Sequence, residues 1–154
     1  MPLKIYIASD HAGFEFKGEL TRFLKKKKYW VTDLGPDKFD PDDDYPDFAA
    51  KVCQKLLKDK GAKGILVCGT GQGMDRVANK FPRLDAAVAW DRFTAEVARD
   101  HGKVGVLCLG ARTVSIDLAR KIVEEWLKKP AKIEMKHQRR IDKIRKIEEG
   151  LKRR

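Results

Sequence analysis

The sequence contains no apolar run that approaches the roughly 20 residues needed to span a membrane as a helix. Residues 1–8 lack the long apolar region of a secretory signal peptide and pass directly into a strand pattern. No internal repeat is present, and no linker is long enough to separate two domains. The 154 residues are therefore predicted to form a single cytoplasmic domain, residues 1–154, without membrane contact.

Cysteine is scarce, and none of the three cysteines forms part of a C-x-x-C pair. An odd number of cysteines without a secretory signal argues against a disulfide framework, and their spacing argues against a zinc site. Cys53 and Cys108 lie inside apolar patterns, which predicts that both pack in the core. Cys68 differs, because three glycines follow it closely. We expect no metal and no other cofactor.

Lysine and arginine outnumber the acidic residues, 34 to 23, which gives a formal net charge of +11. Such a charge is compatible with a nucleic acid, an anionic substrate or a solvated lysine-rich surface. The basic tail, residues 136–154, has little aromatic interleaving and no recognised nucleic-acid-binding motif. We therefore expect no nucleic-acid partner and rank nucleic-acid binding as the third hypothesis.

Strand and helix patterns alternate along the chain. Short apolar runs predict strands at residues 4–8, 30–34, 64–67, 86–90 and 104–109. Helical patterns predict helices at residues 14–27, 48–60, 75–80, 93–100, 115–128 (with Ser115 as N-cap) and 136–154. This alternation predicts an α/β fold: a Rossmann-like three-layer sandwich with a five-stranded parallel sheet and helices on both faces.

The helical tail places Ile141, Ile144, Ile147 and Leu151 in a narrow apolar stripe. An exposed stripe of this kind needs a partner surface. Packing on its own domain is one interpretation, and packing across the interface of a dimer is the sharper one.

Chemically active side chains follow several of the predicted strands, at the edge where doubly wound sheets bind ligands. Asp10 and His11 follow the first strand, and Tyr45 lies in the acidic loop after the second. Cys68 follows the third strand, and Arg112 follows the fifth. Each also has a plainer interpretation, since an Asp-His pair often caps a turn and an arginine can be a surface charge.

The stretch from Cys68 to Gly73 reads C-G-T-G-Q-G and follows the buried run 64–67. Backbone N–H groups in such a glycine-rich turn bind anions. The same field favours a thiolate over a thiol. A base beside an anion-binding turn is what enolate chemistry requires, whereas the alternative is that the glycines only form a tight turn.

These residues closely resemble the ribose-5-phosphate isomerase type B and galactose-6-phosphate isomerase family. The matching segments span nearly the whole chain in order: residues 9–15, 44–47, 68–71, 73–74, 78–80, 106–112 and 137–140. The resemblance implies a metal-independent aldose–ketose isomerase of a phosphorylated sugar, foremost ribose 5-phosphate to ribulose 5-phosphate through an enediolate. Allose 6-phosphate and galactose 6-phosphate are the alternative substrates.

The resemblance also implies roles for the residues of the glycine-rich stretch. Cys68 would remove the proton from carbon 2, and Thr70 would assist proton handling. The backbone at Gly69, Gly71 and Gly73 would hold the enediolate oxygen.

Further roles follow from the resemblance outside this stretch. His101 would open the sugar ring, working with Asp10. Contacts to the phosphate or to the rest of the sugar fall to His11, Tyr45, Arg112, Lys136 and Arg140.

His101 ends the helix before the fifth strand, which places it at the amino edge of its own sheet. If it acts in catalysis, it must reach the site of a neighbouring subunit, so we expect a homodimer or homotetramer. A histidine that interacts with the carboxyl end of its helix is the alternative interpretation.

Four positions depart from the pattern of the family. Gly102 stands where an asparagine is usual, and Gln72 where an apolar residue is usual. Asp75 replaces a serine and is a candidate assistant base. Lys136 replaces an arginine, which keeps the charge but loses the bidentate fork. These departures concern the identity of the sugar more than the class of reaction.

A nucleotide- or dinucleotide-binding protein is the second hypothesis. Gly69, Gly71 and Gly73 follow a strand, and Asp91 lies about 20 residues further on, as the dinucleotide-binding fingerprint asks. However, the third glycine of that fingerprint would fall at Met74, and no Walker lysine pattern is present. This hypothesis therefore ranks below the isomerase.

Overall fold

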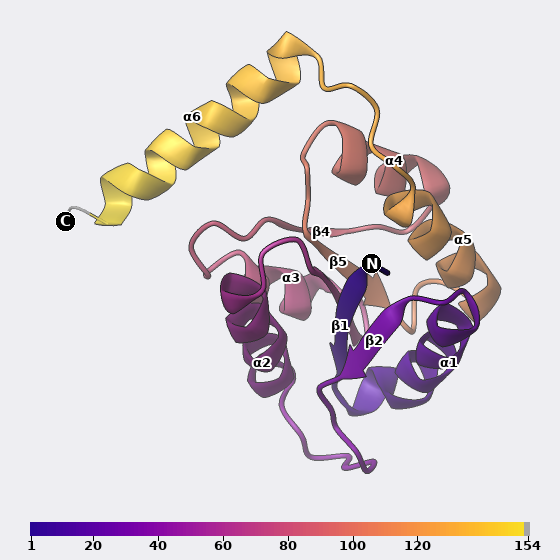
Figure 1. Ribbon diagram of the computed structural model, residues 1–154. Helices are drawn as coiled ribbons and strands as arrows, with labels where there is room; N and C mark the ends of the chain where they lie inside the picture. Colours follow the sequence, from indigo (N-terminus) through magenta and orange to yellow (C-terminus); the bar gives the residue numbers. More distant parts are fainter. Residues whose placement is uncertain (153–154) are drawn as a thin grey trace.

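The computed structural model describes residues 1–152 and contains a five-stranded sheet with the order β2-β1-β3-β5-β4 (Figure 1). The strands are β1 (Lys4–Ser9), β2 (Trp30–Asp33), β3 (Lys63–Cys68), β4 (Ala86–Val88) and β5 (Val106–Gly110). Every neighbouring pair of strands is parallel. All five carboxyl ends therefore lie along one edge of the sheet, toward the bottom of Figure 1.

Helices cover both faces of this sheet (Figure 1). One face is covered by α1 (Phe14–Lys26), α4 (Arg92–Asp100) and α5 (Ile116–Leu127), and the other by α2 (Tyr45–Lys58) and α3 (Gln72–Ala78). A short 3-10 turn, η1 (His11–Gly13), connects β1 to α1. The structure thus confirms the predicted α/β fold with a parallel sheet between two layers of helices.

The central strands are apolar along their whole length because both of their faces are buried. One face packs Ile7, Ile65 and Leu107 against α1 and α5. The other face packs its strand residues against α2 and α3, and it includes Cys53 and Cys108, both fully buried. Burial raises the pKa of the Cys53 thiol to about 12, so this thiol stays protonated. Both cysteines therefore have the predicted core role.

The starts of two helices differ from the sequence prediction. Helix α2 begins at Tyr45 instead of residue 48, because Pro46 is accepted in a first turn, where the missing N–H has no helical partner. Helix α3 begins at Gln72 instead of residue 75, directly after Gly71 in the left-handed region (φ 81°). Ser115 caps α5 as predicted, since its Oγ accepts a hydrogen bond from the Leu118 N–H at 3.1 Å.

Two predicted strands are shorter than expected. Strand β4 ends at Val88, because the backbone N–H of Trp90 already donates to Thr94 Oγ1 in the cap of α4. Strand β5 begins at Val106 instead of residue 104, because the N–H of Val104 donates to the Ala98 carbonyl at the end of α4. The other helix and strand boundaries agree with the prediction to within two residues, and residues 153–154 of the predicted tail lie outside the described residues.

The last helix, α6 (Met135–Lys152), extends away from the sandwich (Figure 1). Its Arg145 pairs with Asp85, which ties it to the segment before β4. Ile144, Ile147 and Leu151 are 56, 64 and 65% exposed. Packing on its own domain therefore does not cover the predicted apolar stripe. Among the helices of residues 1–152, not one has the length and apolar character needed to cross a membrane.

Candidate active site

The loops that follow β1, β3 and β5 meet at the carboxyl edge of the sheet. The backbone N–H of Asp10 donates to the Val67 carbonyl at 3.2 Å, which ties the first loop to β3. The N–H of Arg112 donates to the Gly69 carbonyl at 2.9 Å, which ties the third loop to the glycine-rich turn. The sheet order places β3 between β1 and β5, so the Cys68 turn lies at the centre of this arrangement.

Cys68 ends β3, and its side chain is 5% exposed. The backbone N–H of Gly71 donates to the Cys68 Sγ at 3.2 Å. A hydrogen bond of this kind stabilises a thiolate more than a thiol. Position 71 requires glycine because its φ of 81° is unfavourable for other residues, and a Cβ there would lie 3.1 Å from the Leu109 carbonyl carbon. Gly71 therefore allows the tight turn to form and also donates a hydrogen bond to the Cys68 sulfur.

Two predicted binding residues lie against this turn. A Cβ added to Gly69 would lie 3.1 Å from Arg112 Nη1, so the guanidinium lies beside the backbone of the turn. A Cβ added to Gly73 would lie 2.7 Å from Tyr45 Cζ, so the tyrosine ring at the start of α2 packs directly on that glycine. The structure thus places a guanidinium and a phenol against the glycine-rich turn that follows Cys68.

Asp10 is nearly buried, with 6% of its surface exposed. Its Oδ1 accepts a hydrogen bond from the Gly13 N–H at 3.2 Å, so this carboxylate caps η1. The structure therefore confirms the capping role that the sequence left open for Asp10. The backbone bond of Asp10 to the Val67 carbonyl also places this residue beside the end of β3, one residue before Cys68.

His11 is held by Asp43, a residue that the sequence analysis did not single out. Asp43 Oδ1 lies 2.8 Å from the His11 Nδ1 and also accepts a hydrogen bond from the His11 backbone N–H at 2.8 Å. The hydrogen bond to Asp43, together with the charge of nearby Asp10, raises the pKa of His11 above its ordinary value. The pair favours an imidazolium whose Nε2–H is free of this contact and can donate to an anion.

Thr70 and Asp75 lie at the start of α3. Thr70 is exposed, and its Oγ1 accepts a hydrogen bond from the Gln72 N–H at 3.3 Å. Asp75 is half-buried, and its Oδ1 accepts a hydrogen bond from Asn79 Nδ2 at 3.2 Å. Burial raises the pKa of the Asp75 carboxyl. A carboxylate with a raised pKa is a stronger base, which is consistent with an assisting role.

The remaining predicted residues lie at the opposite, amino edge of the sheet. His101 caps the carboxyl end of α4, and its ring stacks on that of His137 with the centroids 3.8 Å apart. Arg140 lines a hollow of about 480 Å³ together with both histidines. Lys136 forms an exposed ion pair with Glu134 at 2.9 Å. Within one chain, these residues do not join the Cys68 group, as the predicted topology of His101 required.

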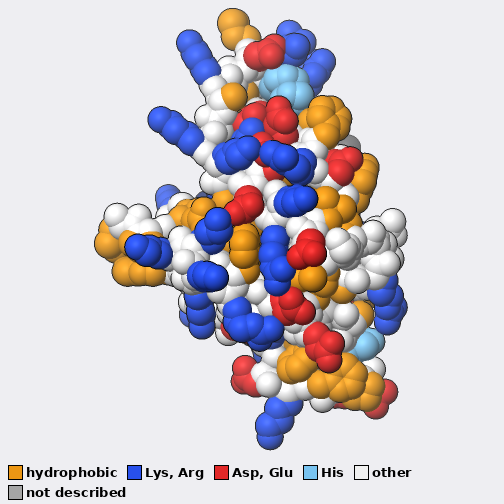
Figure 2. Space-filling view, turned by 90° about the vertical axis from the view of Figure 1, so that its right-hand side faces the viewer, with side chains coloured by type: hydrophobic (Ala, Val, Ile, Leu, Met, Phe, Trp, Pro, Cys, Tyr) orange, Lys and Arg blue, Asp and Glu red, His pale blue; other side chains and the backbone are white. Residues whose placement is uncertain are grey.

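The space-filling view agrees with the separation of the predicted site residues into two groups at opposite edges of the sheet. Figure 2 shows histidine side chains at two separated places, toward opposite ends of one face of the molecule. On the same face, lysine and arginine side chains are mixed with acidic ones instead of forming a continuous basic stripe (Figure 2). Ion pairs such as Lys27–Glu124 at 2.9 Å join the two kinds. This pattern is typical of a solvated surface and does not favour nucleic-acid binding.

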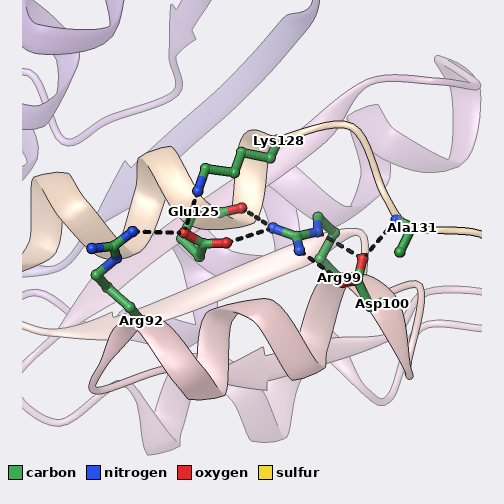
Figure 3. A network of polar contacts seen from close by, with 6 residues as sticks. All are labelled: Arg92, Arg99, Asp100, Glu125, Lys128 and Ala131. Carbon is green, nitrogen blue, oxygen red and sulfur yellow. Dashed lines mark hydrogen bonds and ion pairs between the residues drawn. The ribbon is translucent and has the colours of Figure 1, made fainter.

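A polar network with Arg99, Asp100 and Glu125 at its buried centre holds the carboxyl end of α4 (Figure 3). Arg99 donates to Asp100 through Nε and Nη2, each at 2.7 Å. Arg99 Nη1 donates to Glu125 Oε1 at 3.0 Å and also to the backbone carbonyl of Glu125. Lys128 and Arg92 donate to Glu125 Oε2 at 2.6 and 3.2 Å. The network therefore clamps α4 to the end of α5.

We expect this network to make the protein sensitive to acid. The bonds from Arg99 hold the pKa of Asp100 at about 2, and those from Lys128 and then Arg99 hold that of Glu125 at about 2. Both values are depressed, so the stabilisation is complete above the unfolded values and is lost as the pH falls toward the folded ones. The free energy of unfolding, measured with urea, should decrease from about pH 5 downward, and less steeply in Asp100→Asn.

The dinucleotide-binding hypothesis fails at Asp91. The Oδ1 of this carboxylate accepts hydrogen bonds from the N–H and the Oγ1 of Thr94, at 2.7 and 2.8 Å. Asp91 therefore belongs to the capping box of α4. Met74, at the position of the third fingerprint glycine, is fully buried in the core. Asp91 and Met74 thus have structural roles here.

Comparison with known proteins finds a family model, described as Ribose/Galactose Isomerase, that matches residues 5–144. The chain is 46% identical over 150 residues to the probable ribose-5-phosphate isomerase B of Mycoplasma genitalium, covering 96% of this chain and 97% of that protein. It is 34% identical over 146 residues to the ribose-5-phosphate isomerase B of Mycobacterium tuberculosis, covering 95% and 90% of the two chains.

Solved structures agree with the sequence comparisons. The crystal structure of ribose-5-phosphate isomerase B from Mycoplasma genitalium with bound ribulose-5-phosphate matches with a TM-score of 0.90 at 45% identity, over 97% of this chain and 98% of that chain. The type B ribose 5-phosphate isomerase of Leishmania infantum matches with a TM-score of 0.92 at 38% identity, over 98% and 99%. The similarity in fold extends over nearly the entire length of each chain.

Proposed function

The chain belongs to the ribose/galactose isomerase family, and we propose that it interconverts ribose 5-phosphate and ribulose 5-phosphate by a metal-independent enediolate mechanism. The observation that carries the proposal is the Cys68 thiol at the carboxyl edge of the sheet, 3.2 Å from a backbone N–H of its own glycine-rich turn. Relatives that match over nearly their full length carry the name of this activity. A cytoplasmic location fits an enzyme of sugar-phosphate metabolism.

In the proposed mechanism, the Cys68 thiolate removes the proton from carbon 2 of the open-chain aldose. Negative charge develops on the oxygen of carbon 1, where the backbone N–H groups of the turn other than those of Gly71 and Gln72 stabilise it. The hydroxyl proton on the oxygen of carbon 2 passes to the oxygen of carbon 1, with the Thr70 hydroxyl as relay. The Cys68 thiol then returns its proton to carbon 1, so that the carbonyl lies at carbon 2 and no atom is gained or lost.

Ring opening precedes this chemistry, because ribose 5-phosphate is mainly cyclic. His101 accepts the proton of the anomeric hydroxyl and returns it to the ring oxygen as the bond between that oxygen and carbon 1 breaks. Asp10, nearly buried beside the Cys68 turn, assists this step from the other side of the sugar. The imidazole and the carboxylate come from opposite edges of the sheet, so two chains are needed to supply them.

The site is therefore proposed to form between two copies of the chain. One copy supplies the Cys68 turn with His11 and Arg112 as cations for the phosphate. Its neighbour supplies His101, Arg140 and the less specific Lys136. The exposed apolar stripe of α6 supports this assembly, because burial between copies is the simplest way to remove it from water. A homodimer satisfies this requirement, and a homotetramer contains it twice.

A larger sugar phosphate is the second candidate substrate, and Gly102 is the observation that favours it. Gly102 has no side chain to contact the sugar hydroxyls, and its N–H donates to the Val97 carbonyl at 3.3 Å. A Cβ at this position would lie 3.0 Å from Val104 Cγ2 and 3.3 Å from the Ala98 carbonyl oxygen, so the side chain that usually contacts the sugar in the family is absent and its place is closed by Val104. The loss of that contact changes which sugar hydroxyls the site selects, and allose 6-phosphate and galactose 6-phosphate, each with one more carbon, are the alternatives.

The proposed role of His11 leads to a prediction for Asp43→Asn. The amide retains an oxygen for the Nδ1–H of His11 but removes the charge, so the pKa of His11 should decrease. At neutral pH fewer molecules then carry the imidazolium, and KM for the sugar phosphate should rise roughly fivefold, as expected for a weakened charge-assisted contact. The kcat value should change much less. Steady-state kinetics and an NMR titration of His11 measure both effects.

Asp42→Asn is the matched control for this prediction. Asp42 lies in the same acidic loop and is exposed, and its backbone N–H donates to Asp40 Oδ1 at 3.0 Å. The substitution Asp42→Asn removes the same charge without altering the hydrogen bonds of His11. Equal changes in KM for the two variants would show that only the general field of the loop matters, and that Asp43 does not act through His11.

The proposed activity is tested by assaying the purified chain with ribose 5-phosphate, allose 6-phosphate and galactose 6-phosphate. Preferred turnover of ribose 5-phosphate is the expected result. Preferred turnover of a hexose phosphate would retain the reaction class and attribute the changed preference to the missing side chain at Gly102. The absence of turnover with all three sugars would contradict the proposed function.

A further inference from the structure

We propose that Asp100, with its partner Arg99, is a positioning residue for the ring-opening histidine. The pair fixes the helix end that presents His101 and, at the same time, the path of the chain that places His137 on its ring. This inference rests on the proposed function, in which His101 opens the sugar ring. It assigns a role in the reaction to a network that contacts no substrate.

The geometry of the pair restricts the end of α4 strongly. Arg99 and Asp100 are 8 and 14% exposed and share two parallel hydrogen bonds of 2.7 Å (Figure 3). Glu125 receives the remaining face of the guanidinium and is itself 8% exposed. A bidentate arginine–carboxylate pair out of water holds its geometry far better than a single surface ion pair does. His101 is the next residue along the chain.

The same carboxylate also reaches the connection between α5 and α6. The Asp100 Oδ1 accepts a hydrogen bond from the backbone N–H of Ala131 at 3.0 Å (Figure 3). Ala131 lies six residues before His137, whose ring stacks on His101 with an angle of 11° between the planes. One side chain thus fixes the starting point of both histidines, although they come from segments about 36 residues apart.

The chain after His101 is fixed by further contacts. The His101 N–H donates to the Val97 carbonyl at 2.9 Å, which completes the last turn of α4. The indole N–H of Trp126 donates to the Val104 carbonyl at 3.1 Å. Lys103 Nζ donates to Gln138 Oε1 at 2.8 Å, a second tie between this loop and α6. These contacts hold the backbone after His101, and the Asp100 carboxylate holds the backbone before it. Together they determine the direction in which the imidazole projects from the backbone.

Positioning of His101 matters for the reaction because it sets the distance between the imidazole and the anomeric hydroxyl. A ring-opening group must meet the anomeric hydroxyl within hydrogen-bond reach, and a displacement of about 1 Å can cost about 100-fold in rate. If the neighbour supplies His101, this accuracy depends on the rigidity of the helix end that carries it. His101 itself is exposed, so the rigidity of the helix end must come from neighbouring residues. The Asp100 network provides it.

The test is a double-mutant cycle on the full-length protein. Asp100→Asn replaces one carboxylate oxygen by an NH₂ group, which faces the Arg99 donors. We expect kcat for ribose 5-phosphate to fall about tenfold or more in this variant. If Asp100 acts through His101, adding Asp100→Asn to His101→Asn should cause almost no further loss, because the residue that it positions is already absent.

A second substrate separates positioning from general damage. 4-Deoxyribose 5-phosphate lacks the hydroxyl that closes the furanose ring, so its conversion needs no ring opening. The loss in Asp100→Asn should be much smaller with this analogue than with ribose 5-phosphate. Glu19→Gln, which breaks the exposed Glu19–Arg120 ion pair of 3.0 Å on the same face, is the control and should leave both rates unchanged.

Losses that multiply in the double mutant would overturn the proposal, because they would show that Asp100 supports the fold independently of His101. Equal losses with both substrates would overturn it as well. If Asp100→Asn fails to fold, the same double-mutant cycle is measured with Arg99→Lys, which keeps a charge but loses the bidentate geometry. A wild-type protein without turnover would instead contradict the proposed function, so the two failures are distinguishable.

Discussion

Replacing Cys68 by alanine should reduce kcat for the sugar phosphate by about 10³-fold, the usual contribution of a positioned general base. The side chain is the only change at the turn, because alanine keeps the backbone that donates to the enediolate oxygen. The residual rate measures what substrate binding and the N–H groups of the turn contribute without the base. An assay that follows formation of the ketose, together with exchange of the carbon 2 proton into solvent, measures the loss directly.

The fold should survive this substitution. Cys68 is 5% exposed and lies at the end of β3, so removing one sulfur should lower the free energy of unfolding by only about 1 kcal/mol. Cys53→Ala is the matched control, because it removes the same atom from the same side of the sheet and should leave kcat unchanged. Full turnover by Cys68→Ala would move the base elsewhere, with Asp75 as the next residue to test.

The fold of this chain could be predicted because its strongest sequence signals are local. Strands buried on both faces read as short apolar runs, and the helices between them show their apolar side at helical spacing. Ser115 marked the start of α5 because a serine cap acts on the next three residues. Because the alternation of strands and helices predicts parallel strands, every strand end was expected at one edge, and this identified the Cys68 turn as part of a site.

The parts that could not be predicted depend on contacts between distant residues. Asp43 lies 32 residues from His11, and nothing in the composition of the acidic loop distinguishes it from the aspartates on either side. Arg99 and Asp100 look like the charged end of a surface helix, although the fold buries both of them against Glu125. Pairings of this kind follow from three-dimensional packing, so only the structure reveals them.

The division of the predicted residues between two edges of the sheet has a physical origin. In a parallel sheet, the carboxyl end of a helix lies at the amino edge of the strand that follows it. A residue at the end of α4 therefore cannot approach the end of β3 in the same chain. If Cys68 and His101 cooperate as proposed, a second copy is required and the activity should depend on association.

This requirement gives the final prediction. Cys68→Ala and His101→Asn should each be almost inactive as homodimers, and a mixture formed by coexpression should regain activity. In a mixed dimer, the chain with His101→Asn still supplies Cys68, and the chain with Cys68→Ala still supplies His101, so one of its two sites is complete. Random pairing makes about half of the dimers mixed, so about a quarter of all sites should be active.

The control for this experiment pairs Cys68→Ala with a chain that carries both substitutions. No combination of these two chains contains Cys68, so activity should remain at the level of Cys68→Ala alone. Recovery in the first mixture but not in the control would show that the thiol and the imidazole act from different chains. If the first mixture stayed as inactive as its components, although mass spectrometry showed mixed dimers, then His101 would not complete the site of its neighbour. Its stacking on His137 would then be a contact that serves the end of α4 alone.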